Sequence, residues 1–196
     1  MNKDLAQKLE ELKCRDLQKC SQLISENRLY GNYDREMQQV HIDNAIALDK
    51  IISEHGWTGI SLVGFEGCRT AWLIAQHSIC TPDLQRKFLK LIRAAAERGD
   101  VPKKQAAMLA DRIRFNEGKP QIYGTVLDWD ENGVLGCEVE DINKVDILRN
   151  EVGLPPLQES ITKNQEEVKV EGGKAPEDFI AYRERFLNWA KSVGWQ

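Results

Sequence analysis

The stretch TPDLQRKFLKLIRAAAERGDVPKKQAAMLADRIRFNEG, residues 81–118, decides the fold class. Thr81-Pro82 is typical of a helix start, because threonine can cap a helix and proline suits its first turn. Apolar residues then recur at helical spacing until Gly99. Residues 100–102 repeat the opening, and a second periodic segment continues to Gly118. Two consecutive helices joined by a short turn predict a mainly α-helical protein.

Further helices are predicted on the N-terminal side of this stretch. Leucines at three- to five-residue steps predict an amphipathic helix over residues 3–28, which the Tyr30–Tyr33 segment ends. A second helix is expected over about 34–54. Residues 56–67 hold four glycines around a short apolar run, so a loop or a brief extended piece is expected there. A third helix should follow over about 69–78.

The hydrophobic period changes after Pro120. Residues 121–127 are rich in β-forming side chains, and 134–139 can supply a partner strand. The polar residues 130–133 suit the turn between them, which predicts an antiparallel β-hairpin. A short helix is expected over 145–152.

The predicted fold is a mainly α-helical single domain with a small antiparallel β-hairpin and extra helices at each end. Its segments are an N-terminal amphipathic helix (1–33), a core domain (34–158), a polar linker (159–175) and a C-terminal helix (176–196). This last helix carries an aromatic stripe, which is more typical of packing on the main domain or a partner than of a ligand box. The stripe consists of Phe179, Tyr182, Phe186 and Trp189.

Composition narrows the class of protein. The chain has 196 residues, 41% of them hydrophobic and 30% charged, as in an ordinary globular domain. A net charge of −4 argues against a nucleic-acid-binding protein with a broad basic surface. No apolar run approaches the roughly 20 residues of a membrane span, and the N-terminus lacks a secretory apolar core. We expect a cytoplasmic protein that binds neither nucleic acid nor membrane, and secretion without a cleaved signal stays open.

Five cysteines without a CxxC pair predict neither a disulfide framework nor a zinc knuckle. Two other motifs are also discounted. Residues 128–133 begin like a calcium-binding EF-hand loop, but Val139 stands where the bidentate glutamate belongs, so a hairpin turn is favoured and weak cation binding stays open. The glycines within 56–67 make no phosphate-binding loop. We therefore expect no cofactor and no metal.

Seven short motifs follow one another in the middle of the chain. They are His55-Gly56-Trp57, Ser61-Leu62-Val63-Gly64, Ala71-Trp72-Leu73-Ile74-Ala75-Gln76-His77, Asp111-Arg112-Ile113, Gly118-Lys119-Pro120-Gln121-Ile122-Tyr123-Gly124-Thr125, Val145-Asp146 and Gly153-Leu154-Pro155-Pro156-Leu157. In order and spacing, the stretch from about His41 to Leu157 resembles an uncharacterised bacterial domain family of unknown function, and the first and last helices lie outside it. The family has no established activity, so the resemblance implies a fold unit and candidate positions but no reaction.

The histidines are the first candidates for chemistry. His77 ends the third predicted helix beside Gln76, and because imidazole titrates near neutral pH it is a candidate general acid or base. His41 and Asn44, three residues apart, share one helix face and are candidate substrate contacts, as is Gln76. The alternative is that each histidine, His55 included, is a satisfied buried or capping residue, which the helix dipole favours near a C-terminus.

Asp111 and Arg112 form the second candidate group. Asp111 lies on a largely apolar face of its predicted helix, where a carboxylate needs a partner, and could orient His77. Arg112 points about 100° away and could hold a phosphate or carboxylate of the substrate with its fork of donors. The alternative is a structural ion pair between this helix and the hairpin.

The predicted strand at 121–125 supplies the third group. Alternation places Gln121, Tyr123 and Thr125 on one side, where three hydrogen-bonding side chains suit substrate recognition. Gly124 on the reverse side permits close approach of another backbone. The alternative is a solvated strand face.

Two functional hypotheses of different class follow. The first is a small metal-independent hydrolase or transferase acting on a polar, possibly phosphorylated small molecule, with His77 and Asp111 as its catalytic pair. The second is a non-catalytic adaptor or regulatory binding module that contacts a protein partner through Trp57, Trp72 and the C-terminal aromatic stripe.

Overall fold

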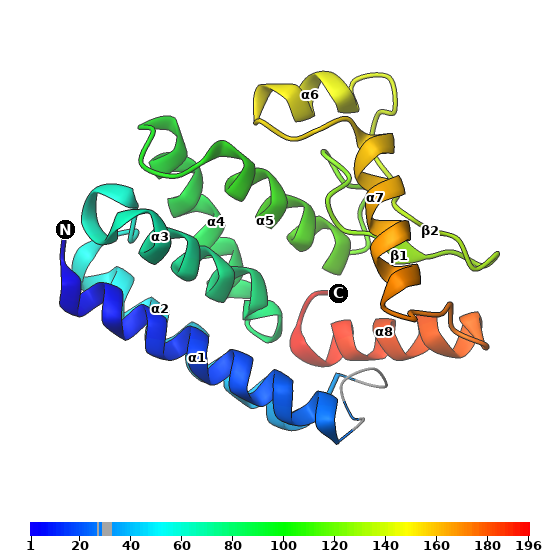
Figure 1. The fold of residues 1–196 in the computed structure, drawn as a ribbon, viewed down its shortest axis with the longest axis horizontal. Helices are drawn as coiled ribbons and strands as arrows, with labels where there is room; N and C mark the ends of the chain where they lie inside the picture. The colour runs from blue at the N-terminus through cyan, green and yellow to red at the C-terminus, as the bar shows by residue number, and fades with distance from the viewer. Residues whose placement is uncertain (27, 29–32) are drawn as a thin grey trace. The chain divides into compact units, whose positions relative to one another are not determined.

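The computed structural model describes residues 1–26, 28 and 33–196 and confirms a mainly α-helical fold with a small antiparallel hairpin (Figure 1). Residues 30–32 of the predicted helix break lie outside the described part. The chain divides into two compact units, Met1–Gln105 and Ala106–Gln196. No helix among the described residues combines the length and apolar character needed to cross a membrane.

The first unit is built from helices alone. Its elements are α1 (Lys3–Ser25), α2 (Arg35–His55), α3 (Ile60–His77), the short 3-10 helix η1 (Ser78–Cys80) and α4 (Pro82–Glu97). Helices α1, α2 and α3 pack against one another, and α4 packs on α3 and η1. Leu9, Leu48 and Phe88 are fully buried between them. Trp57 is also buried, with its ring centroid 6.3 Å from that of Phe88.

The glycine-rich stretch 56–67 is helical from Ile60 onward, so the expected loop is wrong for most of its length. The apolar run forms a first helical turn, in which the backbone N–H of Ile60 donates to the Asp100 carbonyl at 2.9 Å. Gly64 then adopts a φ of 75° and bends the helix at that point. A glycine tolerates this dihedral angle, and the helix can therefore continue beyond the bend to His77.

The second unit contains most of α5 (Lys103–Asn116) and the elements that follow it. These are β1 (Asp128–Trp129), β2 (Leu135–Gly136), α6 (Val145–Glu151), α7 (Leu157–Val170) and α8 (Phe179–Val193). The hairpin is antiparallel, with Trp129 opposite Leu135, and is shorter than predicted. Residues 121–127 form no regular strand, because several of their backbone N–H groups donate to a side chain of α5 instead of to a neighbouring strand.

The expected linker is also wrong for most of its length, since residues 157–170 form α7. Leu157 is buried, and the side-chain amide of Gln165 donates to the Leu135 carbonyl at 2.8 Å, which ties α7 to β2. Leu157, Ile161 and Val168 recur at helical spacing, but charged neighbours mask this short apolar stripe in the sequence.

The C-terminal aromatic stripe packs within its own unit. The ring centroid of Phe186 on α8 lies 5.2 Å from that of Phe115 on α5 and 5.8 Å from that of Trp189. The hydroxyl of Tyr182 donates to the Asp128 carboxylate. The stripe is therefore a packing surface, as the sequence suggested.

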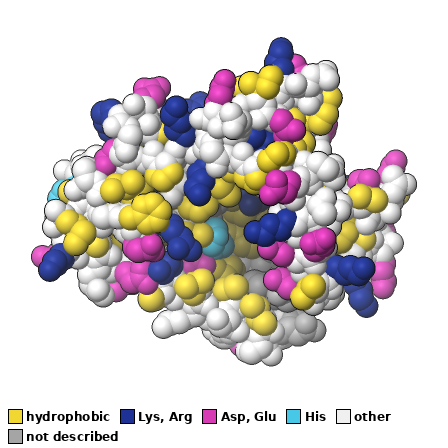
Figure 2. Space-filling model, turned by 45° about the horizontal axis from the view of Figure 1, so that its top comes forward, with side chains coloured by type: hydrophobic (Ala, Val, Ile, Leu, Met, Phe, Trp, Pro, Cys, Tyr) yellow, Lys and Arg dark blue, Asp and Glu magenta, His cyan; other side chains and the backbone are white. Residues whose placement is uncertain are grey.

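Charges of both signs are interspersed over the molecular face drawn in Figure 2, with apolar side chains between them. This distribution agrees with the small net charge of −4.

Replacing Gly124 by alanine should destabilise the second unit. Gly124 has a φ of 65°, and an added Cβ would lie 2.7 Å from Leu157 Cδ1 and 2.9 Å from Cys137 Sγ. We expect the free energy of unfolding to fall by about 2–4 kcal/mol, from the left-handed backbone and the overpacking together. Gly153→Ala is the matched control: its φ is 76° but no atom lies within 4 Å of the added Cβ, so it should cost only about 1–2 kcal/mol. Equal losses in chemical denaturation would show that the space around Gly124 is unimportant.

Candidate functional site

Three helices of the first unit bring a carboxylate and two imidazoles together. Asp16 lies on α1, His41 on α2 and His77 at the end of α3. His77 Nδ1 lies 2.7 Å from Asp16 Oδ2, and His41 Nε2 lies 3.2 Å from the same oxygen. The two imidazole centroids are 4.9 Å apart. We call these three residues the Asp16 cluster.

Asp16 is the member that sequence reasoning missed. The buried side chains of α1 are Leu5, Leu9, Leu12, Asp16 and Leu23. Asp16 therefore continues the leucine stripe four residues after Leu12, whereas the neighbouring Leu17 is 49% exposed. A charged residue at the buried position of an amphipathic helix was the available signal, because such a charge needs a partner.

Neighbouring side chains fix the positions of the two histidines. The Asn44 amide, one turn after His41, donates to the Leu12 carbonyl at 3.0 Å and so holds α2 against α1. The Gln85 amide on α4 donates to the carbonyls of Ala75 and Gln76 at 2.7 and 3.1 Å, which satisfies the end of α3 just before His77. Asn44 and Gln76, both predicted as substrate contacts, are buried beside the cluster.

The environment favours an ionised Asp16. Burial alone raises the pKa of this carboxyl, but its interactions with His41 and His77 outweigh burial and hold the pKa well below its usual range. Burial lowers the pKa of His41, although Asp16 acts in the opposite direction. The Tyr33 hydroxyl makes a hydrogen bond with His41 Nδ1, and burial raises the pKa of Tyr33, so the hydroxyl keeps its proton.

The two histidines differ in access. The His77 side chain is 36% exposed, and among the described residues none makes a hydrogen bond with its Nε2 atom. The His41 side chain is only 9% exposed, and its Nε2 is a buried atom without an aligned hydrogen-bond partner in the described part of the chain. The cluster therefore presents one accessible imidazole, backed by a buried carboxylate.

Asp111 belongs to the second unit, and its carboxylate is occupied there. It accepts hydrogen bonds from the backbone N–H groups of Ile122, Tyr123 and Thr125 at 2.8–3.2 Å, and from the Thr125 hydroxyl at 3.0 Å. The carboxylate bonded to His77 is that of Asp16. Asp111 thus shapes the 121–125 segment.

Gln121 and Thr125 were both predicted to contact substrate, but the side chain of each makes a hydrogen bond within the second unit. The Gln121 amide forms two hydrogen bonds with the backbone of Val126, at 2.8 Å to its N–H and 2.7 Å to its carbonyl. The backbone carbonyl of Tyr123 accepts a hydrogen bond from Arg149, and the Tyr123 side chain is half-buried. None of these residues belongs to the unit that carries His77.

Arg112 is a half-buried guanidinium on α5. Burial lowers its pKa. None of the residues that the structure describes gives it a hydrogen bond or an ion pair, whereas its neighbour Arg114 bonds to the Pro120 carbonyl and to Glu140. A partly desolvated cation without a partner is costly, and an anionic ligand would relieve that cost.

Other candidates lie outside the cluster. The His55 side chain is 39% exposed, and its Nε2 lies 3.7 Å from a carboxylate oxygen of Glu54. In the 128–133 turn, Asp130 Oδ1 accepts the N–H groups of Asn132 and Val134, and Asp128 contacts Tyr182 and Arg183. These bonds support the hairpin-turn interpretation.

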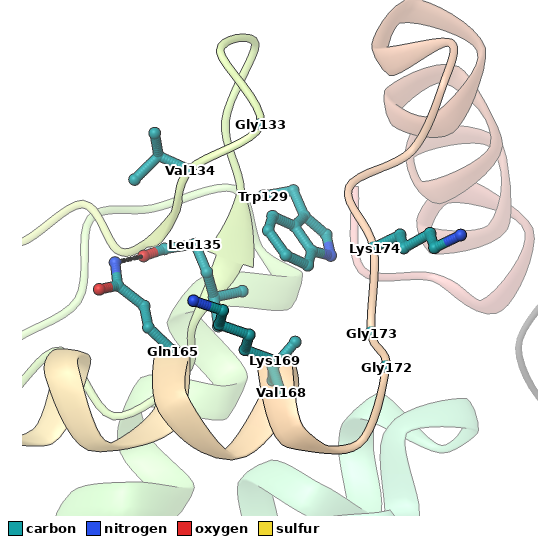
Figure 3. A pocket seen from close by; sticks show the side chains of 10 residues that line it. All are labelled: Trp129, Gly133, Val134, Leu135, Gln165, Val168, Lys169, Gly172, Gly173 and Lys174. Atoms are coloured by element: carbon teal, nitrogen blue, oxygen red, sulfur yellow. Dashed lines mark hydrogen bonds between the residues drawn. The ribbon is translucent and has the colours of Figure 1, made fainter.

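Two of the open pockets among the described residues lie in the second unit. One, of about 500 Å³, lies between the hairpin and the end of α7, and its lining includes Trp129 on β1 and Lys169 on α7 (Figure 3). The other, of about 570 Å³, is lined by residues that include Phe115, Gln121 and Arg183. Neither is lined by a residue of the Asp16 cluster.

Sequence comparison assigns the chain to a protein family. No curated protein and no solved structure matches it. The family match extends over residues 4–170, which includes α1 and α7, so the expectation that the first helix lies outside the family is wrong. Asp16, His41 and His77 all fall inside the match, whereas α8 lies beyond it. The chain belongs to DUF6624, a family of unknown function.

Proposed function

We propose that the protein is a small metal-independent hydrolase or transferase that acts on a polar small molecule, such as a phosphorylated one, with His77 as general acid and base. The observation that carries this proposal is the 2.7 Å contact between the half-exposed His77 imidazole and the buried Asp16 carboxylate. A buried carboxylate behind an accessible histidine is the arrangement by which hydrolytic enzymes orient and activate an imidazole.

The geometry gives each group a defined role. Asp16 Oδ2 accepts a hydrogen bond from the Nδ1–H group of His77, which leaves the lone pair on Nε2, the atom without a described partner. Nε2 can then take a proton from a water or hydroxyl nucleophile and later return it to the leaving group. Asp16 stabilises the imidazolium between these steps. In this role Asp16 replaces Asp111 as the partner of the catalytic histidine.

The second unit offers a position that suits a phosphate or carboxylate group. Support comes from Arg112, a half-buried guanidinium that no described residue pairs with. Arginine binds such groups with two parallel N–H bonds. We propose that Arg112 binds such a group within the second unit.

The adaptor hypothesis has less support. Trp57 is buried, and the Trp72 indole N–H donates to the Gln105 carbonyl at 3.0 Å. The aromatic stripe of α8 packs on Phe115. Of the side chains that were to contact a protein partner, Trp57 is thus interior, and the half-buried Trp72 and α8 stripe already make contacts within their own units.

A cytoplasmic location is part of the proposal. All five cysteines are among the described residues and form no disulfide bond. Reduced thiols are the rule in that compartment.

A ligand screen followed by turnover assays tests the proposal. Nucleotides, sugar phosphates and small carboxylates are added to the full chain, and those that raise the melting temperature are assayed for product by phosphorus or proton NMR. With the substrate so found, His77→Ala should lower kcat at least about a hundredfold, since proton transfer by a positioned side chain typically contributes 10²–10⁴. Because His77 is half-exposed, the melting temperature should change little.

Two variants sharpen the result. His77→Asn can still donate a hydrogen bond to Asp16 but cannot carry a proton, so it should be inactive and fully folded. His55→Ala removes an exposed histidine outside the cluster and should keep full activity. Wild-type kcat in His77→Asn, or inactivity caused only by unfolding, would contradict the catalytic role.

A further inference from the structure

The Asp16 cluster contains the ligand set of a transition-metal site. One nitrogen of each imidazole and one carboxylate oxygen lie within 4.8 Å of one another. Two histidines and one carboxylate bind zinc and related divalent metals, leaving at least one position for water or another ligand. The three residues come from three different helices, so the packed core of the first unit holds the set together.

The distances suit a common ion. Ligand atoms about 2.0–2.1 Å from a tetrahedral zinc lie about 3.3 Å from one another. The contacts from Asp16 Oδ2 to His77 Nδ1 and His41 Nε2 are 2.7 and 3.2 Å, so small side-chain rotations would admit the ion. The imidazole planes are tilted by 43°, and one nitrogen of each ring lies within 3.2 Å of the Asp16 carboxylate.

A second, independent observation points to a ligand. His41 is more than nine-tenths buried, with a relative exposure of 8%. Its Nε2 atom lies 3.2 Å from Asp16 Oδ2 but has no aligned hydrogen-bond partner among the described residues. A buried polar atom without a partner is unfavourable in a folded protein, and a metal ion would satisfy it. On the other side of the ring, Tyr33 bonds to Nδ1. Metal-ligating histidines typically have such an outer partner, which orients the ring.

We propose that Asp16, His41 and His77 bind one Zn²⁺ ion or a similar divalent transition metal. His41 would coordinate through Nε2 with its ring proton on Nδ1, where the Tyr33 oxygen can accept it. His77 would coordinate through Nδ1 with its proton on the exposed Nε2. Asp16 contributes a carboxylate oxygen and the negative charge that a dication requires.

A metal ion on His77 Nδ1 would replace the Nδ1–H bond to Asp16 and keep the ring proton on Nε2, the atom that must be unprotonated to act as a base. The ion would therefore inhibit turnover, a consequence that rests on the proposed function. Binding itself does not rest on it and is measured without substrate. Failure of the enzyme proposal and failure of the metal proposal are thus distinguishable.

The test uses the full chain, freed of metal with a chelator and titrated with Zn²⁺ by calorimetry. We expect one saturable site per chain. His77→Ala should weaken binding by more than about a hundredfold, because loss of an outer partner alone typically costs 10–100-fold. Tyr33→Phe should fall within that smaller range. His55→Ala, the matched control, should bind as tightly as the unaltered protein.

Co²⁺ distinguishes the cluster from the cysteines, which also bind zinc. Coordination by histidine and carboxylate gives visible d–d bands without the intense near-ultraviolet charge-transfer band of a thiolate. Absence of saturable binding, a thiolate band at one equivalent, or unchanged affinity in folded His77→Ala would overturn the proposal. If His77→Ala fails to fold, as judged by circular dichroism, the Co²⁺ spectrum of the unaltered protein decides.

Discussion

Asp111→Ala is expected to lower the free energy of unfolding by about 3–5 kcal/mol, because this carboxylate accepts several hydrogen bonds from the 121–125 segment. Asp111 is fully buried and accepts the N–H groups of Ile122, Tyr123 and Thr125, together with the Thr125 hydroxyl. Alanine would leave three backbone donors without an acceptor, and each unsatisfied buried donor costs about 1–3 kcal/mol before water enters. Urea denaturation of the full chain, followed by far-ultraviolet circular dichroism, measures the loss.

Two variants control for this prediction. Thr125→Val removes only the hydroxyl donor and keeps the carboxylate, so it should cost about 1 kcal/mol. Asp111→Asn keeps one carbonyl oxygen but turns an amide N–H toward backbone donors, and should fall between the two. If Asp111→Ala were no more destabilising than Thr125→Val, the carboxylate would not be organising the loop.

Arg149→Met is expected to lower the free energy of unfolding by about 3 kcal/mol, because it leaves buried acceptors without a donor. Arg149 is only 2% exposed, and its guanidinium donates to the carbonyls of Pro155 and Tyr123 at 2.6 and 2.5 Å and to the Ser160 hydroxyl. Burial lowers the pKa of this guanidinium, while Asp146 and Asp111 act in the opposite direction. Methionine keeps the aliphatic volume but leaves these acceptors without a donor, and thermal and urea denaturation would measure the change.

Arg114→Met is the matched control. The Arg114 Nε atom bonds to the Pro120 carbonyl at 2.5 Å, as that of Arg149 does to Pro155, but the side chain is 26% exposed and its other bond is to an exposed glutamate. Water can replace these bonds, so the cost should be about 1 kcal/mol. Because Asp111 and Arg149 hold the same loop, their double variant should lose less than the sum of the single losses. Equal effects of the two arginine variants would contradict the structural role of Arg149.

The helices were largely predictable because their signals are local. Asp34 caps α2 through its side chain, and Pro82 begins α4, as residue type and spacing indicate. The predicted helices are wrong where local sequence signals conflict with one another. Glycines masked the start of α3, and charged residues masked α7. In both places tertiary contacts, rather than propensity, decide the conformation.

The candidate site was only partly predictable. His77 and His41 were identified from residue type and helix position, but the partner of His77 is Asp16, which lies 61 residues away on α1. Asp111 looked like that partner because a carboxylate on an apolar face requires donors. Its donors are the backbone N–H groups of Ile122 and Tyr123. Every residue type except proline has a backbone N–H group, so the sequence does not show which of them will bond to Asp111.

The amino-acid sequence by itself determined the mainly α-helical class, most helix limits, the hairpin turn and the two histidines of the cluster, because periodicity, capping and residue chemistry act over a few neighbouring positions. Only the tertiary structure decided which carboxylate faces which imidazole, since that depends on how α1, α2 and α3 pack. It also decided that the 121–125 segment bonds to Asp111 and Arg149 instead of to a strand. Pairing between distant polar groups follows from the packing of whole helices, which no local pattern encodes.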